Sequence, residues 1–123
     1  MMASMSSALT VRWSLAEASG GVEEQLRDYV ADSSHARFEK LEGLRFKTWR
    51  MRPREWFEGC YVFVDDAARA AFQEWFTAGA DESPGSRIIG SSPVLIEECE
   101  VVAVAGGPEG FVSVPSYDAA SSS

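Results

Sequence analysis

The apolar residues of this chain change their spacing several times, and the order of these changes restricts the fold more than any other feature. Over residues 9–15 apolar and polar side chains alternate, as in a β-strand with one buried face. Over residues 22–38 the apolar side chains recur every three or four positions, as on one face of an α-helix. The predicted elements are strand 9–15, helix 22–38, strand 44–51, strand 60–64, a helix begun by Asp65 or Asp66 and ended at Gly79, and strand 94–105.

The second and third predicted strands have unusual patterns. Leu44 and Phe46 share one parity in the second strand, whereas Trp49 and Met51 share the other. We expect either a β-bulge near Thr48 or apolar contacts on both faces of this strand. Residues 60–64 are apolar at every position, which is typical of a strand that is buried on both sides.

The β-α-β-β-α-β order predicts an α+β fold of the ferredoxin-like type, in which both helices cover one face of a four-stranded antiparallel sheet. The other face would remain uncovered, although Trp13, Phe46 and Trp49 also need burial. Because monomers rarely expose so large an apolar patch, we expect a homodimer whose two sheets pack face to face. The predicted domain spans residues 8–105, between a disordered segment, 1–7, and a flexible or partner-docked tail, 106–123.

The overall charge and the apolar runs argue against several classes of function. The 123 residues include 19 acidic and 11 basic residues, for a net charge of −8, which argues against general binding to the phosphate backbone of nucleic acids. No apolar run reaches the roughly 18 residues that a membrane-spanning helix needs. The start of the chain, "MMASMSSA", lacks the features of a secretory signal, and the two cysteines indicate free thiols. We therefore expect a cytoplasmic protein.

Seven of the eleven Lys and Arg residues lie between Arg37 and Arg54, interleaved with aromatic residues. One interpretation is an edge strand whose charges prevent pairing with another sheet. A second is that Arg50 or Arg52 binds an oxyanion of a ligand, because a guanidinium pairs with oxyanions through a directed fork. A third is pairing with acidic residues 97–100 of a second copy, which would set the register of a dimer.

The segments "LEGLRFKTWRM" and "EGCYVFVDDAARAAF" resemble the dimeric α+β barrel superfamily, and within it the small YdhR-type monooxygenase-like proteins, which are relatives of the antibiotic-biosynthesis monooxygenases. The shared features are a glycine before a strand with lysine and tryptophan, then a second glycine, an apolar aromatic strand and an aspartate-capped helix. In this chain they are Gly43, Lys47, Trp49, Gly59, residues 61–64 and Asp66. The resemblance covers about residues 8–105. It implies a homodimer with a pocket between the inner sheet face and the helices or loops at the barrel mouth.

Some members of this superfamily oxidise aromatic polyketides with molecular oxygen and no cofactor, whereas others degrade haem, cyclise or isomerise. The resemblance therefore implies a cofactor-independent monooxygenase that acts on a small aromatic or polyketide-like substrate. Such chemistry needs a base and a cradle for the resulting anion in a dry pocket. We expect His35 or Tyr61 near the proton and Arg50 or Arg52 near the anion. The expected pocket walls are Trp13, Phe46, Trp49, Trp56 and Phe63.

Each of these residues also has a purely structural interpretation. His35, the sole histidine, would suit a surface position near a helix end, and aromatic residues on strands are commonly core residues. Trp56, in the predicted connection before the third strand, would then cap the core edge rather than act as a lid.

The sequence contains no P-loop, dinucleotide-binding fingerprint or nucleophile elbow, and its single histidine and two cysteines have no metal-ligand spacing. We therefore expect no cofactor and no metal. A cyclase or isomerase that uses the same pocket without oxygen is one alternative function. A dimeric module that binds a small molecule without catalysis is another.

Overall fold

The computed structural model describes residues 6–116, and its elements follow the predicted strand and helix order. The helical segments in each half of the chain are divided into shorter pieces than the sequence predicts. In chain order the elements are β1 (Ser7–Ser14), α1 (Val22–Tyr29), a π-helical turn (Val30–Ser34), α2 (His35–Glu39), β2 (Leu44–Arg52), β3 (Trp56–Phe63), α3 (Asp66–Ala78), a 3₁₀ turn (Ala80–Glu82), α4 (Pro84–Ile89) and β4 (Leu95–Glu100).

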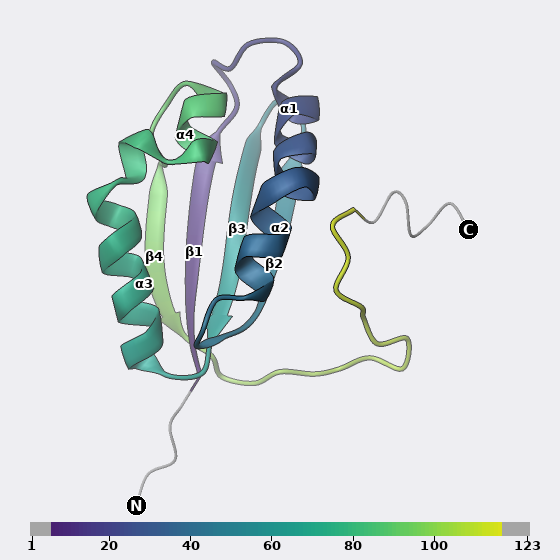
Figure 1. Ribbon diagram of the computed structural model, residues 1–123, viewed down its shortest axis with the longest axis vertical. Helices are drawn as coiled ribbons and strands as arrows, with labels where there is room; N and C mark the ends of the chain where they lie inside the picture. The colour runs from purple at the N-terminus through teal and green to yellow at the C-terminus, as the bar shows by residue number, and fades with distance from the viewer. Residues whose placement is uncertain (1–5, 117–123) are drawn as a thin grey trace, which may run out of the picture.

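The four strands form one antiparallel sheet in the order β2-β3-β1-β4, with the helices on one of its faces (Figure 1). This arrangement confirms the α+β, ferredoxin-like prediction. β2 and β4 are the edge strands of the sheet. The basic segment therefore includes an edge strand, as the first of its three interpretations requires.

The first helical segment changes its winding halfway along. α1 buries Val22 and Leu26 against the sheet and carries two glutamates in its first turn, where the helix dipole favours anions. The following π-helical turn closes with a hydrogen bond from the backbone N–H of His35 to the carbonyl of Val30. Ser34 and His35 are buried at this turn, which joins α1 to α2. The sequence pattern predicted one continuous helix here and gave no sign of the change.

The irregularity of β2 lies between Leu44 and Phe46 and not near Thr48 as predicted. Beyond it, Lys47 pairs with Tyr61 and Trp49 with Gly59, so these residues share the helix-facing side of the sheet. The bulge at the beginning of the strand thus sets the direction of every later side chain in β2. The predicted bulge near Thr48 was wrong in position, because the apolar pattern shows that a phase change occurs but not where. The alternative, apolar residues on both faces, agrees with Phe46 on one side and Trp49 and Met51 on the other.

Three strand boundaries differ from the prediction by two residues or more. β3 begins at Trp56, four residues before the predicted start at Cys60, so that Trp56 is part of a strand and not of a loop. β1 begins at Ser7, where it pairs with Phe63, and β4 ends at Glu100 instead of residue 105. Of the segment 1–7, which was expected to be disordered, residues 1–5 lie outside the described part of the chain.

The core lies between the sheet and the helices. Trp13 from β1 and Phe57, Tyr61 and Phe63 from β3 are buried there against Phe72 of α3 and other helix residues. Trp13 therefore does not contribute to the uncovered face, contrary to the prediction, and neither does Trp49. Of the three aromatic residues expected to need a second copy for burial, Phe46 alone pairs on the uncovered side, beside Val62.

The segment after β4 has no regular secondary structure over residues 101–116 and passes from the end of β4 to the side of β2 (Figure 1). The ring of Phe111 lies 6.2 Å from that of Phe46, and Ser113 Oγ donates a hydrogen bond to Glu39 of α2. This part of the tail thus contacts its own chain. Residues 117–123, which belong to the predicted tail, lie outside the described residues. None of the described helices is long and apolar enough to cross a membrane.

Candidate functional site

A cavity of about 560 Å³ lies between the helix-facing side of the sheet and the helices. Its volume is in the usual range for small-molecule sites, which are mostly apolar and carry a few directed polar groups. The polar groups here include Lys47, Arg37 and Arg87. The aromatic lining consists of Trp13, Tyr29, Phe38, Trp49, Phe57, Tyr61, Phe72, Trp75 and Phe76.

The amine of Lys47 is enclosed by three aromatic rings. Its Nζ atom lies 3.5 Å from the ring centroid of Phe38, 4.3 Å from that of Tyr61 and 4.4 Å from that of Trp49. No ion pair among the described residues includes Lys47. The amine of this part-buried lysine therefore lies inside an aromatic cage, and no carboxylate of the described residues balances its charge.

Burial lowers the pKa of Lys47 well below its ordinary value of 10.5, and the positive charge of Arg37 lowers it further. Cys60 in its ionised form acts in the opposite direction and is the smallest of the three causes. The faces of the three rings attract a cation and so offset part of the cost of a buried ammonium group. Desolvation without a counter-ion is the larger effect. The neutral amine, with a free lone pair, is consequently favoured more strongly here than on a surface lysine.

Gly59 makes room for this lysine. A Cβ atom at position 59 would lie 3.0 Å from Lys47 Cε and 3.2 Å from the hydroxyl oxygen of Tyr61, closer than side chains normally pack. The absence of a side chain at Gly59 thus lets the lysine stem cross β3 toward the cavity. In the sequence, Lys47 and Gly59 are shared features of the resemblance and were not expected in the site. The signal that could have placed Lys47 there is the parity that it shares with Trp49.

Tyr61, one of the two predicted bases, does line the cavity. Its side chain is buried beneath α2 and α3, with ring centroids 5.6 Å from Phe38 and 5.0 Å from Phe72. Burial raises the pKa of the Tyr61 phenol above its ordinary value of 10. A phenol in this state is suited to donate a hydrogen bond but not to accept a proton.

His35, the other predicted base, is buried next to the cavity but is not part of its lining. Its ring centroid lies 5.9 Å from that of Trp49, and its Nε2 lies 3.2 Å from Ser113 Oγ of the tail. The indole N–H of Trp49 donates to Ser34 Oγ at 3.2 Å. His35 therefore supports the wall that Trp49 and Ser34 form.

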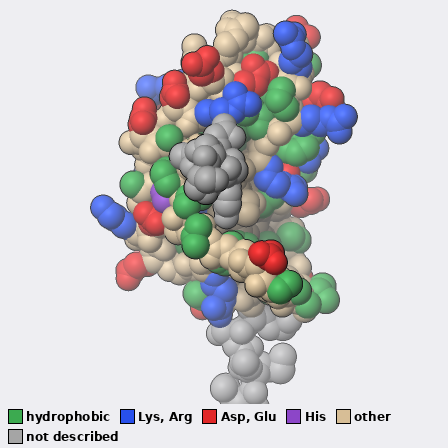
Figure 2. Space-filling view, turned by 90° about the vertical axis from the view of Figure 1, so that its right-hand side faces the viewer, with side chains coloured by type: hydrophobic (Ala, Val, Ile, Leu, Met, Phe, Trp, Pro, Cys, Tyr) green, Lys and Arg blue, Asp and Glu red, His purple; other side chains and the backbone are tan. Residues whose placement is uncertain are grey.

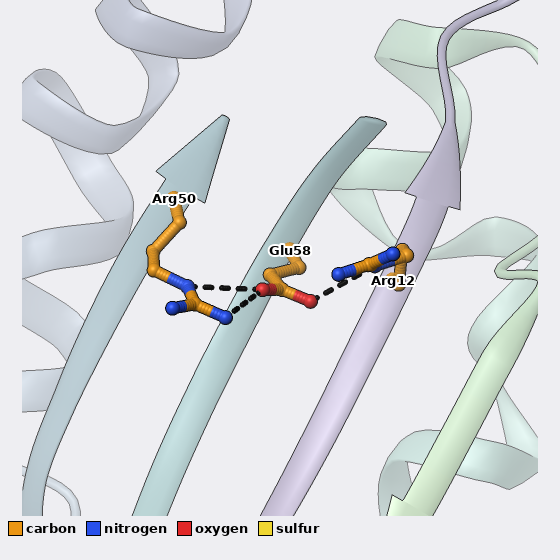
Figure 3. A network of polar contacts seen from close by, with 3 residues as sticks. All are labelled: Arg12, Arg50 and Glu58. Carbon is orange, nitrogen blue, oxygen red and sulfur yellow. Dashed lines mark hydrogen bonds and ion pairs between the residues drawn. The ribbon is translucent and has the colours of Figure 1, made fainter. Parts of the chain in front are cut away.

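Arg50 and Arg52 lie on the opposite face of the sheet from Tyr61 and Lys47, because successive strand residues point to opposite sides. Arg50 donates hydrogen bonds to Glu58, and Arg12 Nε donates to the other Glu58 oxygen at 3.0 Å (Figure 3). Arg52 pairs with Glu55 at 2.8 Å. The structure therefore does not bring these two arginines to the cavity together with the predicted bases.

Glu58 links three adjacent strands through these contacts. Its side chain is only 1% exposed, whereas those of Arg12 and Arg50 are 36% and 58% exposed. Burial alone would raise the pKa of Glu58, but the hydrogen bonds and charges of the two arginines outweigh it and lower that pKa. The carboxylate is thus held in its charged form. Figure 2, which faces the side of β2 and the tail, shows basic and acidic side chains interspersed and not a continuous basic patch.

The expected pocket walls are divided between the two faces. Trp13 and Trp49 line the cavity, and Phe63 lines a neighbouring cavity of about 380 Å³. Phe46 and Trp56 lie on the uncovered face, where the guanidinium of Arg12 stacks 4.3 Å from the Trp56 ring.

The arginines that do line the cavity are Arg37 of α2 and Arg87 of α4. Arg37 is exposed, and its Nη2 donates to the Tyr29 hydroxyl at 2.9 Å. Glu82 is the acidic residue of the lining. The two arginines outweigh the single glutamate, so the lining carries a net positive charge, which suits a ligand with an anionic group.

The fold and this cavity define an α+β protein with a basic, aromatic pocket. No protein-family model matches the sequence, and no curated protein matches it. Among solved structures it is similar to NE2512, a protein of unknown function from Nitrosomonas europaea, with a TM-score of 0.60 and 24% identity over 82% of this chain and 93% of that one. It is also similar to a conserved protein of unknown function from Bacteroides thetaiotaomicron, described as a possible oxidoreductase, with a TM-score of 0.51 and 17% identity over 80% of this chain and 100% of that one. At these identities the likeness shows the fold alone.

Proposed function

We propose that this protein is a cofactor-independent monooxygenase that deprotonates a small aromatic substrate with the amine of Lys47. The observation that carries this proposal is a part-buried lysine in an aromatic cavity, with no ion-pair partner among residues 6–116. A general base works best when its pKa lies near the working pH, and burial moves the pKa of Lys47 in that direction. The description of the Bacteroides protein as a possible oxidoreductase names the same broad class of reaction.

The cavity supplies the other requirements of the reaction. Offset stacking against Trp49 and Phe38 would hold a planar substrate. When the neutral amine accepts a proton, the new ammonium is stabilised by the three ring faces and by the anion that it has created. The phenol of Tyr61 is available to donate a hydrogen bond to the substrate oxyanion. Arg37 and Arg87 add positive charge at the wall.

Oxidation of the substrate anion needs molecular oxygen and no protein-bound electron carrier. A methylene group flanked by aromatic rings gives up a proton to Lys47, and the carbanion transfers its electrons to oxygen. In the net reaction one CH₂ group and one O₂ become one C=O group and one water. A cyclase or isomerase would use the same base and the same pocket without oxygen.

Oxygen uptake with anthrone-type substrates tests this function. The wild-type protein should consume oxygen, Lys47→Met should lose the activity, and Lys40→Met should keep it, because Lys40 lies exposed after α2. Absence of uptake above the spontaneous rate with the wild-type protein would reject the monooxygenase. Turnover of a substrate under nitrogen would instead identify a cyclase or isomerase.

We also propose that a second copy covers the open face of the sheet and makes the protein a homodimer. Phe46, Val62 and Trp56 are part-buried apolar residues on this face, beside the exposed Arg50. The cavity with Lys47 lies within one chain, on the helix side. The second copy would therefore pack on the sheet face opposite the helices and would contribute no residue to the cavity.

A further inference from the structure

We propose that Lys47 is also a covalent binding site, at which its amine condenses with aromatic aldehydes or ketones that enter the cavity. This inference rests on the same caged amine as the proposed function, but it requires neither oxygen nor an acidic substrate. The ligand class that it predicts is a planar aryl carbonyl compound, for which an anionic substituent would be favourable.

The surroundings of Lys47 are suited to attack by its amine on a carbonyl group. The amine belongs to the cavity wall, and its aromatic cage excludes water from most directions. An aryl group can stack on the same rings that flank the nitrogen, which would bring the attached carbonyl carbon near the lone pair. Lysine amines that are desolvated in apolar pockets are the ones that enzymes use to form Schiff bases.

The condensation balances without any further reagent. The Lys47 nitrogen attacks the carbonyl carbon, a C–N bond forms, and the electron pair of the C=O bond moves to oxygen. A proton passes from nitrogen to that oxygen to give a carbinolamine, which then loses water to give the imine. The net change is amine plus carbonyl compound to imine plus water.

Tyr61 is placed to assist the loss of water. Its hydroxyl oxygen and Lys47 Cε both lie next to the Cβ position that Gly59 leaves empty. Burial keeps this phenol protonated, so it can donate to the departing oxygen.

The chain makes the test unusually clear, because it contains only two lysines, Lys40 and Lys47. Lys40 is exposed. Amines in water are mainly protonated at neutral pH and react slowly with carbonyl compounds. If accessibility alone decided the reaction, Lys40 would react faster. Selective reaction at Lys47 would be the opposite result.

The experiment incubates the full-length protein with 2-naphthaldehyde and sodium cyanoborohydride at pH 7, followed by digestion and mass spectrometry. We expect reductive labelling of Lys47 to exceed that of Lys40 by about tenfold or more, because its lowered pKa leaves a larger fraction of its amine neutral. Excess 2-naphthol, which has the same shape but no carbonyl, should slow the labelling. Lys40→Arg should retain the label, whereas Lys47→Arg and Lys47→Met should lose it while keeping the native circular dichroism spectrum.

Equal labelling of both lysines, or labelling confined to Lys40 and the N-terminus, would overturn the inference. Its failure is distinguishable from failure of the proposed function. If Lys47 is labelled but no oxygen is consumed, the imine site is supported and the monooxygenase is rejected. Oxygen uptake that depends on Lys47, without any labelling, would show that the amine acts only as a base.

Discussion

The Nζ atom of Lys47 lies 3.5 Å from the ring centroid of Phe38, so that a strand residue and a helix residue enclose the same point of the cavity. β2 supplies the amine and α2 supplies one of the ring faces that shield it from water. The bulge at the start of β2 turns Lys47 inward, and the π-helical turn joins α1 to the helix that carries Phe38. The bulge in β2 and the π-helical turn before α2 thus adjoin the residues that form the proposed site.

The buried amine should make stability depend on pH. The pKa of Lys47 is lower in the folded protein than in the unfolded chain, so between these two values the unfolded chain binds more protons. The free energy of unfolding should therefore rise with pH across this window, up to about 10.5. Lys47→Met should remove that rise and stabilise the protein at neutral pH by about 0.5–2 kcal/mol.

Urea unfolding between pH 6 and 10 measures this effect, with Lys40→Met as the control that keeps the wild-type pH dependence. A flat wild-type profile, or a Lys47→Met variant that is less stable at every pH, would show that the lysine remains a stabilising ammonium group.

Gly59→Ala should disturb both the lysine and the sheet. The new methyl group would meet Lys47 Cε at 3.0 Å, and we expect a loss of about 1–3 kcal/mol in the free energy of unfolding, as is usual for overpacked cores. Gly79→Ala is the matched control, because a Cβ there meets nothing within 4 Å. In a Lys47→Ala background the cost should shrink but not vanish, since Tyr61 also lies close to the new methyl group. Additive costs would mean that Gly59 and Lys47 do not share this space.

Glu58→Gln should weaken the connection between β1, β2 and β3. It removes the charge from two hydrogen-bonded arginine contacts, and because both arginines are partly exposed we expect a loss of only about 1–2 kcal/mol at neutral pH. The folded pKa of Glu58 is lowered, so this contribution is present above about pH 4.5 and disappears as the pH falls through the folded value.

Denaturation of the wild type and the Glu58→Gln variant between pH 2 and 7 checks this assignment, because the two free energies should converge at low pH. Glu55→Gln, which breaks the exposed pair with Arg52, should cost less than about 0.5 kcal/mol. An equal loss in both variants would mean that the burial of Glu58 adds nothing to its ion pairs.

Val62→Arg should separate the proposed dimer. Val62 lies on the uncovered face of the sheet between Ala8 of β1 and Phe46 of β2, where a second copy would pack. Sedimentation at micromolar concentration should give a dimer for the wild type and a monomer for the variant. Ala67→Arg, an exposed substitution on α3 at the helix side, should remain dimeric. A monomeric wild type would reject the homodimer but not the cavity, which one chain forms by itself.

The alternating periods of the sequence determined the order of strands and helices, and with it the fold. Alternation with a period of two fixes which residues of one strand share a face, and the 3.6-residue period does the same for a helix. The element order also places β2 at a sheet edge, in agreement with the first interpretation of the basic segment. On α3, Phe72 and Phe76 are four residues apart and both face the core. Trp75, one residue before Phe76, is 67% exposed at the cavity.

Only the tertiary structure decided which face of each strand meets the helices. A shift of one residue reverses every side chain that follows, and the bulge between Leu44 and Phe46 is such a shift. It turns Lys47 and Trp49 into the cavity and leaves Arg50 and Arg52 on the other side. The pairing partners of a bulged strand depend on contacts with residues far along the chain, and a periodic pattern in one segment contains no information about them.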